Sequence, residues 1–195
     1  MKQYLNSILV LCAAASVSAQ TTATYDDVTV APVPLQPVGT YKGLTYNAFN
    51  FANQGKLAVG GVKSQSGTNR IASSFEIQEM AGTPSISIAK GTPYTSFSPL
   101  DFYFGCGLND ENTAVTQAEQ CTVTVAGFVA GKNQEVALAS YTFTPPAVEV
   151  APVLMLHAVL PNTFLQKLVN ITIIQTDPAL NTLLVDNFRY NLNKR

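Results

Sequence analysis

The stretch from Ser98 to Phe128 reads SPLDFYFGCGLNDENTAVTQAEQCTVTVAGF and holds two of the three cysteines of the chain. Near each end of it, apolar and polar residues alternate, which predicts two strands with one buried face. The apolar positions are Leu100, Phe102, Phe104 and Cys106 in the first run and Cys121, Val123 and Val125 in the second. We therefore predict a hairpin closed by a Cys106–Cys121 disulfide. Closing a loop of about 15 residues contributes roughly 3 kcal/mol in the chain-entropy description.

The first nineteen residues have the pattern of a secretory signal peptide. Lys2 precedes an apolar run from Leu5 to Ala15, and Val17-Ser18-Ala19 forms a small-x-small cleavage site. The run is too short to cross about 30 Å of hydrocarbon, which argues against a membrane anchor. We expect residues 1–19 to be removed and the product to be extracellular, either free or held non-covalently in a cell wall.

Residues 20–195 are expected to form a single domain with a sizeable core. Loss of the signal would remove Lys2, so that ten basic side chains face twelve acidic ones without a run of either sign. This balance argues against nucleic acid as a partner. Cys12 would leave as well, and the two cysteines left in an oxidising compartment are expected to pair.

The chain predicts an all-β fold. Short runs rich in β-branched and aromatic residues are separated by proline and glycine, which favours an antiparallel β-sandwich of jelly-roll type with about ten strands. At 71–79, strand is favoured over helix because Phe75 and Ile77 alternate with polar residues. The apolar segment 153–160 is expected to be a fully buried strand.

Catalytic patterns are absent from the sequence. The single histidine, His157, lies between apolar neighbours and is expected to be structural, and no G-x-S-x-G elbow accompanies it. Pairs such as Glu76 and Glu79 lack a distinctive motif for glycoside hydrolysis. We therefore expect a non-catalytic protein that needs no cofactor.

One face of the predicted hairpin is suited to binding a sugar. A pyranose offers an apolar face and a belt of hydroxyls, and tyrosine must supply any platform because the chain has no tryptophan. Tyr103 shares its parity with Asp101 and, across the hairpin, with Thr122 and Thr124. The alternative is an ordinary solvated sheet face.

Two further sites are predicted. Asn170-Ile171-Thr172 is an N-glycosylation sequon whose acceptor has the polar parity of its strand. Asp26, Asp27 and Asp186 lie near opposite ends of the chain, which commonly meet in a jelly roll, and carboxylates there could hold a structural Ca²⁺. The alternative is that these three residues have only the ordinary roles of aspartate at turns and strand edges.

Five short motifs follow one another along the chain, at 25–27, 41–49, 102–106, 121–128 and 184–188. Their order resembles that in a group of small secreted fungal proteins of unknown function, and also in bacterial jelly-roll domains akin to carbohydrate-binding modules. The resemblance implies a secreted sandwich and no catalytic residues. Where those relatives often place tryptophan, this chain has Tyr46, which the resemblance suggests as a weaker platform.

The sequence supports three hypotheses about function. The first is a secreted protein that binds cell-wall or other extracellular polysaccharide. The second is a structural or host-interaction protein with a protein partner, which a large exposed apolar patch would favour. The third, a polysaccharide hydrolase or lyase, lacks a nucleophile motif.

Overall fold

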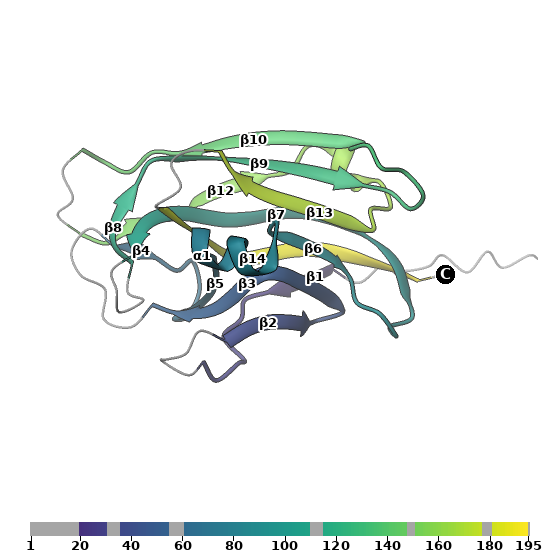
Figure 1. The fold of residues 1–195 in the computed structure, drawn as a ribbon, viewed down its shortest axis with the longest axis horizontal. Coiled ribbons are helices and arrows are strands. Elements are labelled where there is room, and N and C mark those ends of the chain that lie inside the picture. Colours follow the sequence, from purple (N-terminus) through teal and green to yellow (C-terminus); the bar gives the residue numbers. More distant parts are fainter. Residues whose placement is uncertain are drawn as a thin grey trace, which may run out of the picture.

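A computed structural model describes residues 20–30, 36–54, 61–109, 115–147, 151–176 and 181–194. The expected signal peptide lies outside these residues. Fourteen strands, one α-helix and one 3₁₀ helix are described (Figure 1). The elements are β1 (Gln20–Ala23), β2 (Gln36–Tyr41), β3 (Leu44–Asn53), β4 (Val62–Lys63), β5 (Asn69–Ser73), α1 (Phe75–Ala81), β6 (Ser85–Ile88), β7 (Tyr94–Asn109), β8 (Val115–Glu119), β9 (Cys121–Phe128), β10 (Ala137–Phe143), β11 (Val153–Leu154), β12 (Leu156–Val159), η1 (Asn162–Leu165), β13 (Asn170–Gln175) and β14 (Asn181–Lys194).

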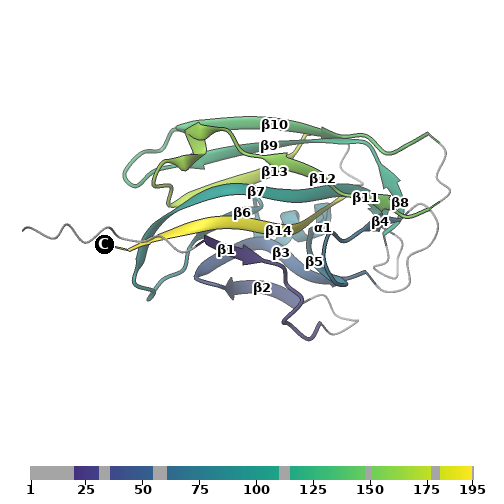
Figure 2. The same cartoon turned by 180° about the vertical axis from the view of Figure 1, so that it is seen from behind.

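Twelve of the strands form one curled antiparallel sheet. Its order is β10-β9-β13-β6-β3-β5-β14-β7-β12, with β1 beside β14, β2 beside β3 and β8 beside β7; β4 and β11 form a small parallel pair. The two ribbon views show β10 at one extreme of the molecule and β2 at the other (Figures 1 and 2). The sheet nearly closes on itself. Its first and last strands, β10 and β12, are linked by a hydrogen bond in which the Tyr141 hydroxyl donates to the Val159 carbonyl oxygen at 2.6 Å.

This arrangement confirms the predicted all-β antiparallel sandwich of jelly-roll type. The strands outnumber the roughly ten expected from sequence patterns because several pieces, such as β4 and β11, are only two residues long. Inward positions alternate as predicted along β9, whose residues are buried and half-buried in turn from Cys121 to Phe128. The predicted Cys106–Cys121 disulfide is confirmed, and both of its cysteines are fully buried.

The predicted hairpin is wrong in one respect. The partner that follows β7 is β8, which pairs Cys106 with Glu119; the chain then passes Gln120 and enters β9, which pairs with β10 and β13 instead. The disulfide therefore joins two strands that are not hydrogen-bonded to each other. It links β7 to the start of β9, where the chain leaves the β7–β8 pair and enters a different part of the sheet.

Two local predictions are also corrected. The segment after β5 is the helix α1, which Ser74 caps by accepting from the Ile77 backbone N–H at 3.4 Å, and which ends at Gly82 in the left-handed region. The segment 153–160 is not fully buried, since Leu154 is 67 % exposed and Val159 is 60 % exposed. It forms the short strands β11 and β12, and β12 terminates the order of the large sheet, so one of its sides faces outward.

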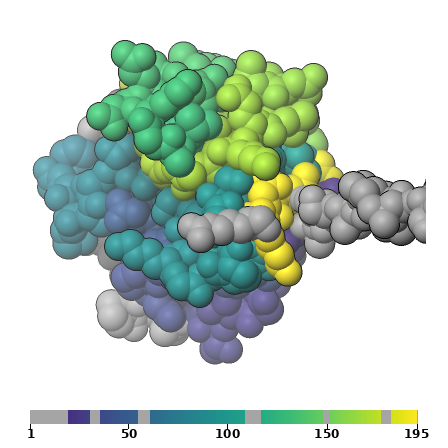
Figure 3. Space-filling view, turned by 90° about the vertical axis from the view of Figure 1, so that its right-hand side faces the viewer, coloured from purple at the N-terminus to yellow at the C-terminus, as the bar shows by residue number. Residues whose placement is uncertain are grey.

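Figure 3 shows the sandwich from the end at which β9 turns into β10. The turn between β9 and β10 lies there beside the segment that leads into β13. Val136 donates to the Gly127 carbonyl and Val169 donates to the Phe128 carbonyl, both at 2.8 Å. This turn supplies control positions for the tests described below.

Candidate functional site

Four polar and aromatic side chains from three adjacent strands meet on the outside of the sheet. We call Asp101, Tyr103, His157 and Arg189 the outer-face cluster. The strand register explains their meeting, because Tyr103 on β7 lies opposite His157 on β12, and Asp101 lies opposite Arg189 on β14. Two of these residues, Asp101 and Tyr103, were predicted from the sequence as ligand contacts.

Asp101 is the electrostatic centre of the outer-face cluster. The Arg189 guanidinium donates to it through two nitrogens, with Nε at 2.7 Å from Oδ1 and Nη2 on Oδ2. His157 Nε2 also lies 3.4 Å from Oδ1. The hydrogen bond to Asp101 raises the pKa of Arg189. Because the carboxylate is only 2 % exposed and already paired, it positions its neighbours rather than acting as a free base.

The aromatic part of the cluster is a stacked pair. The Tyr103 and His157 rings have centroids 4.4 Å apart and an interplanar angle of 7°. His157 and Arg189 keep 38 % and 41 % of their side-chain surface exposed. A flat ring pair therefore lies beside a guanidinium with free N–H donors, all reachable from solvent.

The other predicted sugar contacts do not join this cluster. Thr122 and Thr124 lie on β9, which does not pair with β7, and their hydroxyls face Thr142 at 3.1 Å and Ser140 at 3.5 Å on β10. The predicted single face shared by Asp101, Tyr103 and the two threonines is therefore wrong. The physical reason is that β8, not β9, follows β7 in the hairpin.

Tyr46 does not present a platform either. Its ring is 3 % exposed and packs edge-on against Tyr25, with centroids 6.0 Å apart, and also against Tyr41. Burial raises the pKa values of Tyr25 and Tyr46 well above the ordinary value. Tyr46 belongs to the core, which corrects the expectation that followed from the family resemblance.

The structure places Asp27 apart from Asp26 and Asp186, the other two aspartates predicted to bind Ca²⁺. Asp27 accepts a hydrogen bond from the Tyr41 hydroxyl, which is the main cause of its lowered pKa, and lies 3.8 Å from the Lys42 ammonium. Asp26 and Asp186 instead both bind the loop that precedes β5. Within the described part of the chain, no group of three or more His, Cys, Asp or Glu could hold a metal.

The Asp26 and Asp186 carboxylates are already occupied by donors. Asp26 Oδ1 accepts from the backbone of Thr68 and Asn69, at 3.2 and 3.3 Å, and Asp186 accepts from the backbone of Ser66 and Asn187, at 2.9 and 2.7 Å. These N–H groups point at the oxygens that a cation would need. The arrangement does not fit a Ca²⁺ site and instead fastens the loop to the two strand ends.

Burial of Asp186 predicts a pH dependence of stability. Desolvation, followed by the charge of Asp26, raises the pKa of Asp186 to about 6. Between its ordinary pKa near 4 and this value, the folded state keeps a proton that the unfolded state has lost, so stability should fall as pH rises through this window. The fall should approach about 3 kcal/mol. Urea unfolding at pH 4 to 7 tests this, and Asp186→Asn should flatten the slope; an equal slope in both proteins would contradict it.

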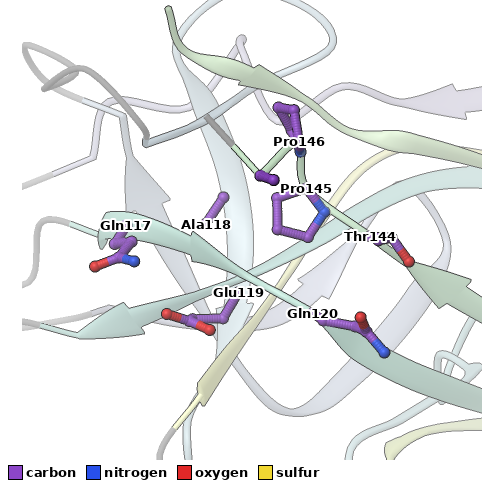
Figure 4. Close-up of a pocket in the computed structure, with 8 residues that line it drawn as sticks. Gln117, Ala118, Glu119, Gln120, Thr144, Pro145 and Pro146 are labelled. Atoms are coloured by element: carbon purple, nitrogen blue, oxygen red, sulfur yellow. The ribbon is translucent and has the colours of Figure 1, made fainter. Parts of the chain in front are cut away.

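A polar hollow of about 420 Å³ lies where β8 meets the end of β10, lined by Gln117, Glu119, Gln120, Pro145 and Pro146 among others (Figure 4). Gln117 and Glu119 lie on one side of the β8 ribbon and the two prolines on the other. Its one charged side chain has no second acid or base beside it among the lining residues. This hollow offers no catalytic pair.

The predicted glycosylation sequon lies at the start of β13. Asn170 begins β13, which lies between β6 and β9, and the residue is half-buried with an unpaired, buried Oδ1. Its glycosylation stays a prediction that intact-mass analysis before and after glycosidase treatment would check.

Among the described helices, none has the length and apolar character needed to span a bilayer.

Sequence reasoning missed Arg189 and treated His157 as structural only. Arg189 lies between Phe188 and Tyr190, which are both fully buried. A charged residue between two apolar ones on a strand indicates an outward-facing side chain, so its exposure could have been predicted. Its partner, however, is 88 positions away. Nothing local in the sequence indicates that pairing.

No protein-family model matches the sequence, and no curated protein matches it. Among solved structures, the chain is similar to a DUF4465 family protein from Bacteroides caccae, with 14 % identity, a TM-score of 0.50, and coverage of 91 % of this chain and 93 % of that one. At this identity the likeness shows the fold alone.

Two further solved structures are similar at lower scores. One is the CBM22-1 xylan-binding domain of Xyn10C from Paenibacillus barcinonensis, with 14 % identity, a TM-score of 0.38, and coverage of 93 % of this chain and 99 % of that one. The other is a Stig cyclase from Fischerella sp., with 14 % identity, a TM-score of 0.37, and coverage of 90 % and 89 %. These two likenesses carry no functional argument.

Proposed function

We propose that this protein is a secreted, non-catalytic β-sandwich that binds an extracellular polysaccharide through the outer-face cluster. The observation that carries the proposal is the exposed Tyr103–His157 stack beside the Arg189–Asp101 pair. An aromatic surface suits the C–H face of a sugar ring, and fixed polar groups suit its hydroxyls.

The geometry also accounts for how such a site would stay in place. Arg189 is fixed by two hydrogen bonds to a buried carboxylate, which in turn lies beside His157. Side chains held in this way lose little conformational freedom when a ligand arrives, which favours binding. The three strands that carry them are central or paired parts of the sheet rather than loops.

Retention on insoluble polysaccharides tests the proposal. The disulfide-intact protein should be retained by at least one of chitin, β-glucan, cellulose and mannan, with or without a chelator. Tyr103→Ala should weaken that retention by about tenfold or more, equivalent to 1.4 kcal/mol. Tyr94→Ala is the matched control, because Tyr94 is also half-exposed but lies at the start of β7, whereas the cluster residues of β7 lie in the middle of that strand.

Three outcomes would contradict the proposal. Retention that is equal in wild type and Tyr103→Ala would exclude this face as the contact. Absence of retention on every polymer would exclude polysaccharide binding of these classes. Release of reducing sugar during the incubation would instead show catalysis.

A protein partner is the second candidate function, and one observation favours it. Exposed apolar side chains follow one another along β11, β12 and η1, at Leu154, Leu156, Val159 and Leu165. A photo-crosslinking residue placed at position 159 should capture such a partner from extracellular fluid, whereas one at Lys132 should not. No specific adduct at position 159 would remove this candidate.

A further inference from the structure

A second cavity, of about 320 Å³, lies between the β2–β3 hairpin and α1. It shares no residue with the outer-face cluster. The residues that matter below are Pro37 on β2, Asn47 and Asn50 on β3, and Ile77 and Met80 on α1. Its volume is at the lower end of the range for small-molecule sites, about 300 to 1,000 Å³, which suits a single ring rather than a chain.

An irregularity in β3 aims two amides into this cavity. Pro37 pairs with Asn50 and Gly39 pairs with Tyr46, so one residue of β2 faces three residues of β3. Within that bulge, Ala48 is buried and has a φ of 56°, in the left-handed region that alanine avoids. In a regular strand Asn47 and Asn50 would point to opposite faces. The bulge reverses the parity, and both residues line the same cavity.

Asn47 also fixes the opposite wall. Its Nδ2 donates to the carbonyl oxygens of Ala81 at 2.8 Å and Thr83 at 3.3 Å, at the end of α1. With Nδ2 used in these two bonds, the carbonyl oxygen of the same amide is the atom left to accept from a ligand. Asn50, half-buried on the same side, adds a donor and an acceptor.

The other side chains that line the cavity are uncharged and, apart from the buried Tyr46 hydroxyl, apolar. Met80 is 81 % exposed at the rim, while Ile77 on the same helix is buried. None of the residues that line the cavity carries a formal charge. A charged ligand would lack a partner here, and a purely apolar ligand would make no use of the Asn47 carbonyl oxygen or the Asn50 amide.

We propose that this cavity binds a neutral pyranose ring, with Asn47 and Asn50 on its hydroxyls and Met80, Ile77 and Pro37 against its C–H face. Both requirements, an apolar surface and paired donors and acceptors, are met by the same few residues. This site is separate from the outer-face cluster and does not depend on it. The strained bulge at Ala48 is the local cost of bringing the two amides together.

A titration of the isotope-labelled, disulfide-intact protein followed by NMR tests this proposal. The probes are the neutral methyl glycosides of glucose, xylose, galactose and mannose, with glucuronate as a charged probe and cyclohexanol as an apolar one. At least one glycoside should cause saturable shifts in the amides of 46–50 and 77–81. Glucuronate and cyclohexanol should bind at least about tenfold more weakly, equivalent to 1.4 kcal/mol.

Variants separate this site from the proposed function. Asn50→Ala and, as a surface variant that should not disturb folding, Met80→Ala should each weaken glycoside binding severalfold or more. Asn133→Ala in the exposed turn between β9 and β10 is the matched control and should bind normally. Tyr103→Ala should also leave this titration unchanged. No saturable shift with any glycoside, tighter binding of cyclohexanol or glucuronate, or an unchanged affinity in Asn50→Ala and Met80→Ala would overturn the proposal.

Discussion

Replacing Cys106 and Cys121 together with alanine should lower the free energy of unfolding by about 3 kcal/mol. The disulfide closes a loop with a sequence separation of 15, and its loss frees that loop in the unfolded chain. Both positions are fully buried, so alanine adds a small cavity but no unpaired polar group. Urea unfolding of the two proteins at equal pH measures the loss.

A serine pair at the same positions provides the comparison. Two hydroxyl groups would then lie at fully buried positions, and each unpaired one costs about 1 to 3 kcal/mol more than alanine. We therefore expect the stability order wild type, alanine pair, serine pair. A reductant should destabilise the wild type and leave the alanine pair unchanged. Equal stability of the wild type and the alanine pair would contradict the argument.

The disulfide shows both what local patterns predict and what they miss. Period-two alternation placed both cysteines on the buried face, because parity is a property of each strand by itself. The pattern could not show that β8 intervenes, since the choice of partner depends on the course of the whole chain. The pairing of the cysteines was thus predicted correctly from an incorrect hairpin.

The helix α1 illustrates competition between two local signals. Phe75 and Ile77 alternate with polar residues, which favoured a strand. Ser74 and Gly82, however, occupy the capping positions of a short helix, and these decided the conformation. A capping pair eight positions apart was therefore more informative here than four residues of alternation.

The candidate sites were less predictable than the fold. Asp101 and Tyr103 could be selected by parity, but Arg189 and His157 come from strands that only the tertiary fold brings alongside. The cavity beside α1 depends on Ala48 in a left-handed conformation, which no preference of alanine indicates. A site that depends on strand register or on a bulge cannot be predicted from a single sequence.

The second large effect is expected at Gly67, in the loop that Asp26 and Asp186 hold. Gly67 has a φ of +45°, and a Cβ there would lie 2.0 Å from Asp26 Oδ1. Alanine would have to displace a carboxylate that accepts from Ser66, Thr68 and Asn69. Backbone strain and the lost hydrogen bonds together should cost at least about 3 kcal/mol in urea unfolding.

Gly131→Ala separates the steric part of this effect from the backbone part. Gly131 has a φ of +74°, and no atom lies within 4 Å of its expected Cβ, so its substitution should cost only the backbone strain, about 1 to 2 kcal/mol. If Asp26 is the obstacle, Gly67→Ala in an Asp26→Ala background should cost no more than Gly131→Ala. This double-mutant comparison isolates the contact, because Asp26→Ala removes the three atoms nearest to the new Cβ. An unchanged cost of Gly67→Ala in that background would show that the backbone, and not the carboxylate, requires glycine at this position.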